Sequence, residues 1–295
     1  MKYLSVAQTA KKWGVSERTV RNYCAAGKIP DAFLTGKTWN IPETARRPER
    51  INKKSDAPKT LLEVLKAEKA GKVKGGIYHK VQIELTYNSN HIEGSRLTYD
   101  QTRYIYETNT IGMENGAVNV DDIVETANHF KCIDMVIDAA NQPASEAFIK
   151  QFHRALKSGT SDARKGWFAV GEYKKLPNEA GGQDTTPPEM VAKEIKELLA
   201  AYNGRKAKTL EELIEFHTAF EAIHPFQDGN GRVGRLLECL RNNSVPFIID
   251  EESKMFYYRG LHEWKLERGY LMDTCLAAQD KFKKYLDYFR VPYEE

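Results

Sequence analysis

HPFQDGNGRVGR, residues 224–235, joins two predicted helices and thereby decides the fold of the longer part of this 295-residue chain. The first helix must end near His224, because the residue before a proline is pushed out of the α region. The second begins near Asn230. Apolar residues recur at helical spacing on both sides of the junction: Leu210, Leu213, Ile214, His217 and Phe220 before it, and Val233, Leu236, Leu237 and Leu240 after it. The sequence therefore predicts two core helices that meet at a polar, glycine-rich connection.

This connection has the composition of an anion-binding cradle. Gly229, Asn230 and Gly231 lie at the start of the second helix, where backbone N–H groups are unpaired and the helix dipole is positive. Arg232 and Arg235 are three residues apart and so share a helix face. Cations in the first turns oppose the dipole by roughly a few tenths of a kcal/mol. A bound polyphosphate would reverse that sign and accept bidentate contacts from both guanidinium groups.

Two further side chains of the stretch suit chemistry on such an anion. Asp228 is a carboxylate at the rim, fit for a Mg²⁺ that keeps several waters and bridges phosphate oxygens. His224 can accept a proton from an incoming hydroxyl when its imidazole is neutral. Each feature alone has an ordinary interpretation, as a buried histidine, a turn or a solvated helix face. Together, and in this order, they predict group transfer from a nucleoside triphosphate.

Composition restricts the class of protein. The hydrophobic fraction of 41% is typical of a globular protein. No apolar run approaches the roughly 20 residues that span a bilayer, and the N-terminus lacks a signal-peptide pattern. We therefore expect a cytoplasmic protein without a membrane partner. The cysteines have no metal-ligand spacing and predict reduced thiols rather than a disulfide framework: Cys24, Cys132, Cys239 and Cys275.

Beyond residue 58 the sequence predicts a mainly α-helical body. Further helices are expected over 77–93, 98–107, 121–140, 145–157, 188–202 and 261–286. The pattern changes between Trp167 and Pro188. Residues 167–170 and 173–176, on either side of Gly171, predict a β-hairpin or extended flap.

The first 58 residues predict a separate basic module. Residues 1–59 contain 13 Lys/Arg and five Asp/Glu, a net charge of +8, which leaves −5 for the remainder of a chain whose total is +3. Ser5 can cap a helix over 6–13, and Ser16 can cap a second over 17–26 that Gly27 ends. A three-residue turn containing Gly14 joins them, which is typical of a helix-turn-helix.

The second of these helices carries side chains that reach phosphates and base edges in a major groove: Arg18, Arg21 and Asn22. Residues 29–42 predict a two-stranded wing whose tip carries Lys37. This segment resembles the winged helix-turn-helix of excisionase- and MerR-type DNA-binding domains. Helix-turn-helix units also serve as protein-docking modules, so both interpretations stay open. Residues 46–58 predict an exposed linker, with domains over 1–58 and 59–295.

The stretch 224–235 matches the H-x-F-x-D-G-N-G-R-x-x-R signature of the Fic (Fic/Doc) family at every defined position. The resemblance covers roughly residues 60–290 and implies a Fic-type helical bundle. Family members typically move AMP from ATP to a Ser, Thr or Tyr hydroxyl of a target protein. The Doc branch phosphorylates its target and carries Lys where this chain has Gly231, so the glycine favours nucleotidyl transfer.

The resemblance also implies roles for single residues. His224 would be the general base, Asp228 would hold Mg²⁺ at the α- and β-phosphates, and Phe226 would anchor the loop. Gly229, Asn230 and Gly231 would form the anion hole. The triphosphate would contact the following turn, with Arg235 on the γ-phosphate; the nucleotide-binding residues implied there are Arg232, Val233, Gly234 and Arg235.

A second motif predicts a built-in brake. Residues 89–94, SNHIEG, fit the family's inhibitory pattern [S/T]-x-x-x-E-[G/N]. Ser89 and Glu93 share a helix face, and Gly94 suits a helix C-cap. Glu93 can take the place of the γ-phosphate at Arg235, which would misalign ATP for in-line attack. The alternative is an exposed carboxylate at a helix end.

The resemblance places a target-binding flap and an adenine-side aromatic pair in this chain. The flap residues are Gly171, Tyr173, Gly182, Gln183 and Asp184, which would pair with an extended target segment through main-chain hydrogen bonds. Tyr257 and Tyr258 would border the adenine, or else be core aromatics. Cys239 and Lys265 stand where several relatives have Asn, which leaves the donor's base open.

Three hypotheses follow. The first is an autoinhibited protein adenylyltransferase that uses ATP and Mg²⁺, modifies a target protein or itself, and carries a DNA-binding leader. The second is a transcription regulator whose Fic-like body responds to nucleotide. The third is an enzyme that removes AMP from a modified target, with Glu93 positioning a water. A homodimer is expected if the module binds paired half-sites.

Overall fold

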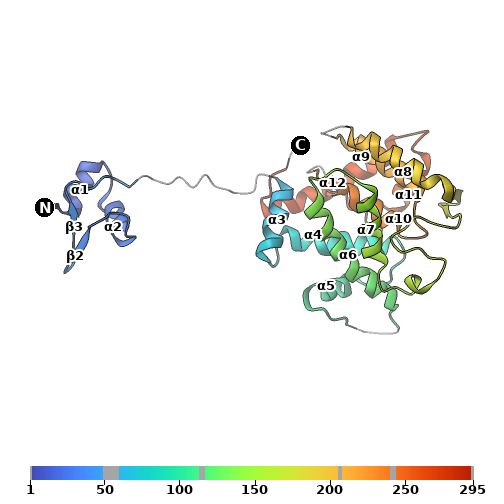
Figure 1. Ribbon diagram of the computed structural model, residues 1–295, viewed down its shortest axis with the longest axis horizontal. Helices are drawn as coiled ribbons and strands as arrows, with labels where there is room; N and C mark the ends of the chain where they lie inside the picture. The colour runs from blue at the N-terminus through green and yellow to red at the C-terminus, as the bar shows by residue number, and fades with distance from the viewer. Residues whose placement is uncertain (1, 49–59, 113–116, 205–207, 240–243, 294–295) are drawn as a thin grey trace. The chain divides into compact units, whose positions relative to one another are not determined.

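The computed structural model describes residues 2–48, 60–112, 117–204, 208–239 and 244–293, without the side chains of Glu238 and Cys239. The chain divides into two compact units, residues 1–57 and 58–295 (Figure 1). The predicted linker lies largely outside the described residues. Among the described helices none is both long and apolar enough to cross a membrane.

The smaller unit is built from two helices and a three-stranded antiparallel sheet. Its elements are β1 (Tyr3–Leu4), α1 (Val6–Trp13), α2 (Glu17–Ala25), β2 (Phe33–Thr35) and β3 (Thr38–Pro42), with sheet order β1-β3-β2. Ser5 and Ser16 cap the two helices through their side chains, and Gly14 ends α1 in the left-handed region. The core of this unit contains Val6, Ala10, Val20, Cys24, Ile29 and Ile41.

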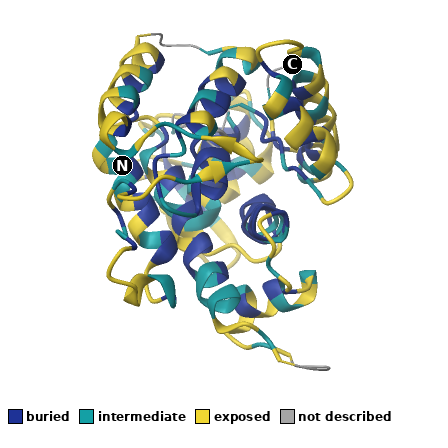
Figure 2. Cartoon of the chain, turned by 90° about the vertical axis from the view of Figure 1, so that its right-hand side faces the viewer, coloured by how far each residue is buried: buried dark blue, intermediate teal, exposed yellow. Residues whose placement is uncertain are grey.

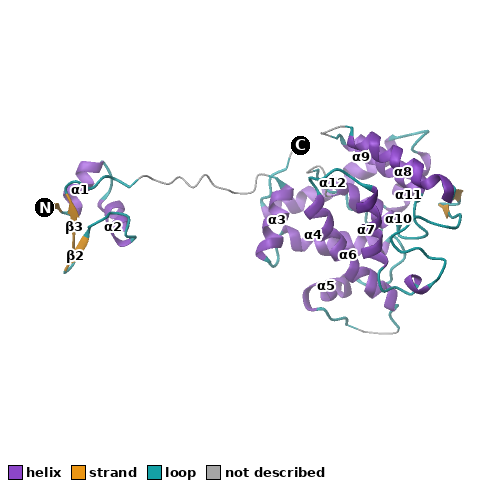
Figure 3. Cartoon of the chain, viewed as in Figure 1, coloured by secondary structure: helices purple, strands orange, loops and turns teal. Residues whose placement is uncertain are grey.

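The larger unit is mainly helical (Figure 3). Its helices are α3 (Leu61–Gly71), α4 (Ile77–His91), α5 (Tyr99–Thr108), α6 (Val120–Ala139), α7 (Glu146–Lys157), α8 (Pro188–Asn203), α9 (Leu210–Ile223), α10 (Asn230–Cys239), α11 (Lys254–Glu263) and α12 (Gly269–Phe289), with a short 3₁₀ turn at Asp162–Arg164. Threonine–Glu/Gln capping boxes begin α3, α5 and α9. A two-stranded hairpin, β4 (Glu179–Ala180) and β5 (Gln183–Asp184), precedes α8.

Helices α9 and α10 meet where the sequence predicts. Helix α9 ends at Ile223, His224 adopts a left-handed conformation, and α10 begins at Asn230. Helix α10 packs against α4, α6, α7 and α9, and Phe226, Val233 and Leu236 are fully buried. Figure 2 shows buried residues gathered on the inner sides of the helices, with exposed residues on the outside. The motif loop is therefore anchored in the centre of the core.

Two expectations are wrong. The single helix expected over 261–286 is two helices, α11 and α12, which pack closely at Gly260, where a Cβ would lie 2.7 Å from the Leu271 Cβ. Around Gly171 we expected a β-hairpin or an extended flap; no hairpin forms there, and the hairpin of this region lies at 179–184. Residues 167–176 form no strand because their backbone bonds to other parts of the unit: the N–H of Gly171 donates to His153 and that of Lys174 to the Pro225 carbonyl.

A buried ion network ties α6, α7 and α10 to the motif loop. The Lys157 ammonium at the end of α7 lies 2.5 Å from Glu125, 2.9 Å from Asp162 and 2.7 Å from Asp228, and its side chain is only 2% exposed. Arg232 bonds to Glu125 and, at 3.4 Å, to Asp228. Two buried cations thus share three carboxylates, of which Asp228 is about half exposed. Removal of one partner of such a set leaves uncompensated buried charge, which is costly.

We predict that Lys157→Met lowers the free energy of unfolding of the larger unit by about 3–5 kcal/mol at pH 7. Arg232 and Lys157, opposing the effect of burial, lower the pKa of Asp228 to about 2. The stability from this depressed pKa is present above the unfolded value of about 3.9 and is lost as pH falls through the folded value. The loss in the variant should therefore shrink below about pH 4.

Guanidinium denaturation of the full chain measures this, with the exposed Lys196→Met as the matched control. A difference between the two variants of less than about 1 kcal/mol at pH 7 would contradict a structural role for the network.

Candidate active site at the start of helix α10

His224 caps helix α9 with a positive φ of 50°, which is unusual for a residue other than glycine. Its Nδ1 lies 3.3 Å from the Glu221 carbonyl oxygen. A carbonyl only accepts, so Nδ1 carries the proton and Nε2 is left as the acceptor nitrogen. Burial lowers the pKa of His224, which favours the neutral ring. The side chain is 17% exposed, so a substrate hydroxyl can reach it.

The loop between His224 and α10 is braced from within. The side-chain amide of Asn230 accepts from the Phe226 N–H and donates to the Phe226 carbonyl, both at 2.8 Å. Gly229, at φ 83°, precedes the helix. The Asn230 side chain is therefore structural, and only its backbone N–H, with those of Gly231 and Arg232, belongs to the free first turn of α10.

Sequence reasoning missed His153, which holds the same loop from α7. Its ring stacks on Phe226 with centroids 4.0 Å apart and planes 7° apart. Its Nδ1 accepts from the Gly171 N–H at 2.9 Å, so Nε2 carries the proton and donates to the Asp228 carbonyl at 3.1 Å. Burial lowers the pKa of His153 to about 3, which keeps the ring neutral. The sequence signal that could have identified His153 is its place on the apolar face of the helix predicted over 145–157.

The structure brings Glu93 and Arg235 together, 142 residues apart in sequence. The Glu93 Oε1 lies 2.6 Å from the Arg235 Nη2. Arg235 also donates to the Ser89 hydroxyl at 3.2 Å and to the Ser89 carbonyl at 3.1 Å. The guanidinium is 3% exposed; burial alone would lower its pKa, but Glu93 raises it.

The Glu93 carboxylate lies directly over the first turn of α10. A Cβ on Gly231 would overlap the Glu93 Oε1 and lie 2.8 Å from the Arg235 Nη1. The carboxylate therefore occupies the electropositive helix start, where an anionic ligand would also bind. With 24% of its side chain exposed, Glu93 is held here by Arg235 rather than by burial.

Other predicted nucleotide-binding residues have different surroundings. Arg232 points to Glu125 and Asp228 in the buried network. Val233 is fully buried, and Gly234 packs against Glu221 and His217, where a Cβ would lie 2.8 and 2.9 Å from their polar atoms. Val233 and Gly234 could therefore contact a nucleotide only through their backbone groups.

Asp228 is suited to hold a metal ion beside this cradle. Its carboxylate is 48% exposed, and its low pKa keeps it ionised. Carboxylate oxygens of Glu125, Asp162 and Asp228 lie within 4.8 Å of one another. Lys157 bonds to all three carboxylates, and Asp228 is the most exposed of them. One carboxylate with phosphate oxygens and waters fits the ligand set that Mg²⁺ prefers.

The aromatic pair is divided between core and surface. Tyr257 is fully buried, with its hydroxyl 2.5 Å from the His217 Nε2. Tyr258 is 38% exposed and donates its hydroxyl to the Ile92 carbonyl at 3.1 Å. Of the pair, Tyr258 is therefore the one that a ligand can reach, and it links α11 to the residue before Glu93. The side chain of Cys239 lies outside the described residues.

The predicted flap residues fall into two groups. Gly182, Gln183 and Asp184 belong to the exposed β4–β5 hairpin, and the Gln183 amide lies 2.8 Å from the His262 Nε2 on α11. Gly171 and Tyr173 are not in the hairpin: Gly171 is buried against His153, and Tyr173 packs on Phe226. Both residues therefore precede the hairpin in the chain, and their contact with a target stays a prediction.

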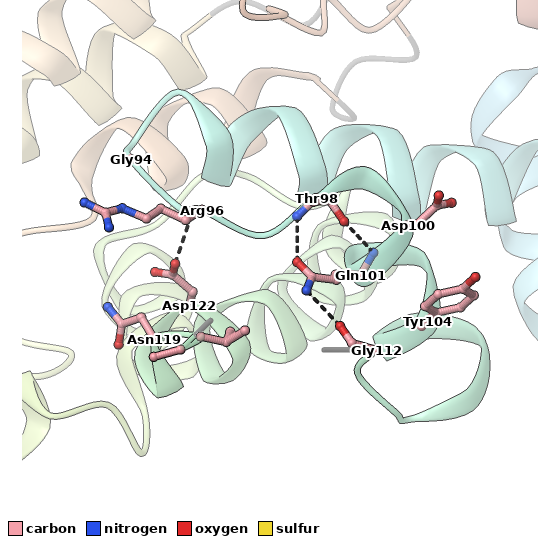
Figure 4. Close-up of a pocket in the computed structure, with 11 residues that line it drawn as sticks. Gly94, Arg96, Thr98, Asp100, Gln101, Tyr104, Gly112, Asn119 and Asp122 are labelled. Atoms are coloured by element: carbon pink, nitrogen blue, oxygen red, sulfur yellow. Dashed lines mark hydrogen bonds between the residues drawn. The ribbon is translucent and has the colours of Figure 1, made fainter. Parts of the chain in front are cut away.

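A separate cavity of about 1070 Å³ lies between the loop after Glu93, helix α5 and the start of α6 (Figure 4). Its polar lining bonds largely to itself: the Arg96 N–H donates to Asp122, and the Gln101 amide donates to the Gly112 carbonyl. No residue of 224–235 lines it. It therefore adjoins Gly94 at the end of the 89–94 segment rather than the start of α10.

The predicted DNA-contacting residues lie on the smaller unit. Arg18, Arg21 and Asn22 are exposed on α2, and Arg21 pairs with Glu17 at 3.1 Å. Lys37 is exposed at the turn between β2 and β3.

Comparison with known proteins agrees with this geometry. Residues 143–240 match the Fic/DOC family model. Protein adenylyltransferase Fic of Aedes aegypti is 26% identical over 219 residues, covering 72% of this chain and 42% of that protein. Protein adenylyltransferase fic-1 of Caenorhabditis elegans is 24% identical over 184 residues, covering 60% and 35%. The chain thus spans about two fifths of the length of these relatives.

Solved structures share the fold. A Fic domain-containing signaling protein from Bacteroides thetaiotaomicron superimposes with a TM-score of 0.57 at 27% identity, covering 77% of this chain and 90% of that one. Fic-1 of C. elegans superimposes with a TM-score of 0.59 at 19% identity, covering 78% and 71%. Residues 143–240 of this chain are thus similar to the Fic/DOC family, and the relatives that the chain matches are named protein adenylyltransferases.

Proposed function

We propose that this chain is an autoinhibited protein adenylyltransferase, which moves AMP from ATP to a Ser, Thr or Tyr hydroxyl of a target protein or of itself. The ion pair between Glu93 and Arg235 over the first turn of α10 carries this proposal. A buried guanidinium at a helix N-terminus is suited to an anionic ligand. The names of the homologues supply the reaction class.

The reaction needs a base, an anion cradle and an in-line geometry. The Nε2 of His224 takes the proton of the target hydroxyl, whose oxygen attacks the α-phosphorus of ATP. A new P–O bond to the target forms as the bond to the β-phosphate oxygen breaks, and pyrophosphate leaves. The free N–H groups of Asn230 and Gly231 stabilise the phosphate charge. A Mg²⁺ ion held by Asp228 would neutralise charge on the phosphates.

Inhibition follows from competition for one cation. Arg235 is the proposed partner of the γ-phosphate, and Glu93 already fills that place at 2.6 Å. Two anions cannot share the position, because like charges at such a distance repel strongly. ATP would then bind with its γ-phosphate displaced and its α-phosphorus out of line. Removal of the Glu93 carboxylate should therefore relieve the inhibition and raise the rate of AMP transfer.

We predict that Glu93→Gly raises the rate of AMP transfer, including self-modification, by at least about tenfold, since a change of 1.4 kcal/mol in the barrier is enough. Adding His224→Ala to that variant should abolish transfer, because no base remains. Incorporation of labelled AMP from ATP and Mg²⁺, with mass spectrometry of the product, measures both.

Glu252→Gly is the control, since Glu252 also lies in a turn and is 90% exposed. If Glu93→Gly transfers AMP no faster than Glu252→Gly, there is no brake at Glu93.

Removal of AMP from a modified target is the second candidate activity. The partial exposure of Glu93 favours it, because the carboxylate could also orient a water. Release of AMP from a modified protein that is lost in Glu93→Gly would identify this reaction. In the Glu93→Gly variant, a gain of AMP transfer and a loss of AMP removal are measured independently.

We further propose that residues 1–57 bind DNA through α2. Support comes from the exposed Arg18, Arg21 and Asn22 on one short helix and from the exposed Lys37. Residues three and four apart share a helix face, as a groove-binding helix requires. The net charge of +8 over residues 1–59 favours a polyanionic partner.

We predict that Arg18→Ala with Arg21→Ala weakens binding of the full chain to a mixed-sequence DNA duplex. Each phosphate contact that is lost should reduce the slope of log K against log salt by about 0.9. Fluorescence anisotropy across salt concentrations measures it. Lys193→Ala with Lys196→Ala removes the same charge from the larger unit, and equal weakening by the two pairs would contradict a specific role for α2.

A further inference from the structure

Lys174 holds the peptide groups on both sides of His224. Its backbone N–H donates to the Pro225 carbonyl at 2.8 Å, and its side-chain Nζ lies 3.3 Å from the Ile223 carbonyl. Only 3% of the residue is exposed. One residue from a distant segment therefore bonds immediately before and immediately after His224.

His224 needs such support because of its backbone conformation. A left-handed residue with a Cβ costs roughly 1–2 kcal/mol relative to the right-handed form, and the imidazole direction changes with that conformation. Pro225 has no N–H to contribute to the turn. The His224 N–H bonds to the Phe220 carbonyl, and the carbonyls of Ile223 and Pro225 are two further groups by which the turn can be fixed; Lys174 bonds to both of them.

The same ammonium group reaches the base of the β4–β5 hairpin. Its Nζ lies 2.7 Å from the Asn178 Oδ1 and 2.6 Å from the Thr185 Oγ1, so it bonds to a residue on either side of the hairpin. Asn178 in turn donates to the Phe226 carbonyl at 2.9 Å. The hairpin and the His224 turn therefore share one buried cation.

We propose that Lys174 is a positioning residue, which fixes the imidazole of His224 and couples it to the state of the β4–β5 hairpin. This inference rests on the proposed function of His224 as the base. It gives the hairpin a second role besides contact with a target: a segment that pairs with β4 or β5 stabilises the Asn178 and Thr185 acceptors and, through Lys174, the productive direction of His224.

Electrostatics adds a separate readout. Lys174 bonds to three neutral oxygens, and burial lowers its pKa to about 8, opposed by Glu194 of α8. Around His224, burial and the Lys174 ammonium lower the pKa of the ring. The Glu221 carbonyl, Glu93 and Asp228 raise it. Loss of the ammonium should therefore raise the pKa of His224 and protonate the base at a higher pH.

The test compares Lys174→Met, Lys174→Arg and the exposed neighbour Lys175→Met in the full chain. NMR titration of the His224 ring reports its pKa without any turnover. We expect Lys174→Met to raise that pKa by about 0.5 unit or more, while Lys174→Arg, which keeps the charge and donors, stays near the parent. Lys175→Met should not differ from the parent.

Kinetics of the same three changes in the Glu93→Gly chain give the second arm. We expect Lys174→Met to lower kcat by about 10- to 100-fold with the nucleotide Kd within about twofold, since misplacement of a base costs rate rather than binding. The acidic limb of its pH profile should move to higher pH. Lys174→Arg should recover much of the rate.

Equal His224 pKa values and equal kcat for Lys174→Met and Lys175→Met would overturn the proposal, as would failure of Lys174→Arg to recover either. If Lys174→Met does not fold, Thr185→Val removes one hairpin acceptor of the ammonium, and an unchanged kcat there overturns the coupling. An inactive Glu93→Gly parent would contradict the proposed function instead, and the titration would still test Lys174.

Discussion

A buried guanidinium must have an anion beside it, and in this chain Arg235 has Glu93. Removal of Glu93 would leave the buried guanidinium without its partner, whereas the Glu93 carboxylate itself is partly exposed. The cation is placed at the start of α10, where the helix dipole also favours negative charge. The pair therefore fixes an anion position inside the protein. In the proposed function, this position belongs either to Glu93 or to the terminal phosphate of a nucleotide.

The loop around that position is rigid because contacts from several elements hold it in place. Asn230 hydrogen-bonds to the backbone of Phe226, and His153 stacks on the Phe226 ring. Lys157 and Arg232 form ion pairs with Asp228. Gly231 leaves room for a carboxylate or phosphate on the open side. Rigid donors aimed at one point are what stabilisation of developing charge requires. In contrast to this rigid loop, Glu93 is partly exposed and the β4–β5 hairpin is exposed.

Local rules were enough to predict where α9 ends and where α10 begins, since Pro225 and the glycines restrict the backbone strongly at that junction. The motif at residues 89–94 likewise predicted a contact between residues 142 apart, Glu93 and Arg235, and the structure has it. Other features depend on packing that spacing does not encode. The Lys157 network joins Glu125, Asp162 and Asp228 from three segments, and α11 and α12 approach each other closely at Gly260. The segment before the hairpin has strand-like composition, but its hydrogen bonds go to His153 and Pro225.

The central claim is that Glu93 and the γ-phosphate compete for Arg235. Calorimetric affinities of ATP and ADP for the parent and for Glu93→Gly test it without any target protein. We expect the parent to bind ATP and ADP with similar affinity, because Glu93 keeps the γ-phosphate from Arg235. Glu93→Gly should favour ATP over ADP by about tenfold or more, the effect of one charge-assisted contact worth about 1.5–3 kcal/mol. An ATP-to-ADP ratio that is the same in both proteins would contradict the account.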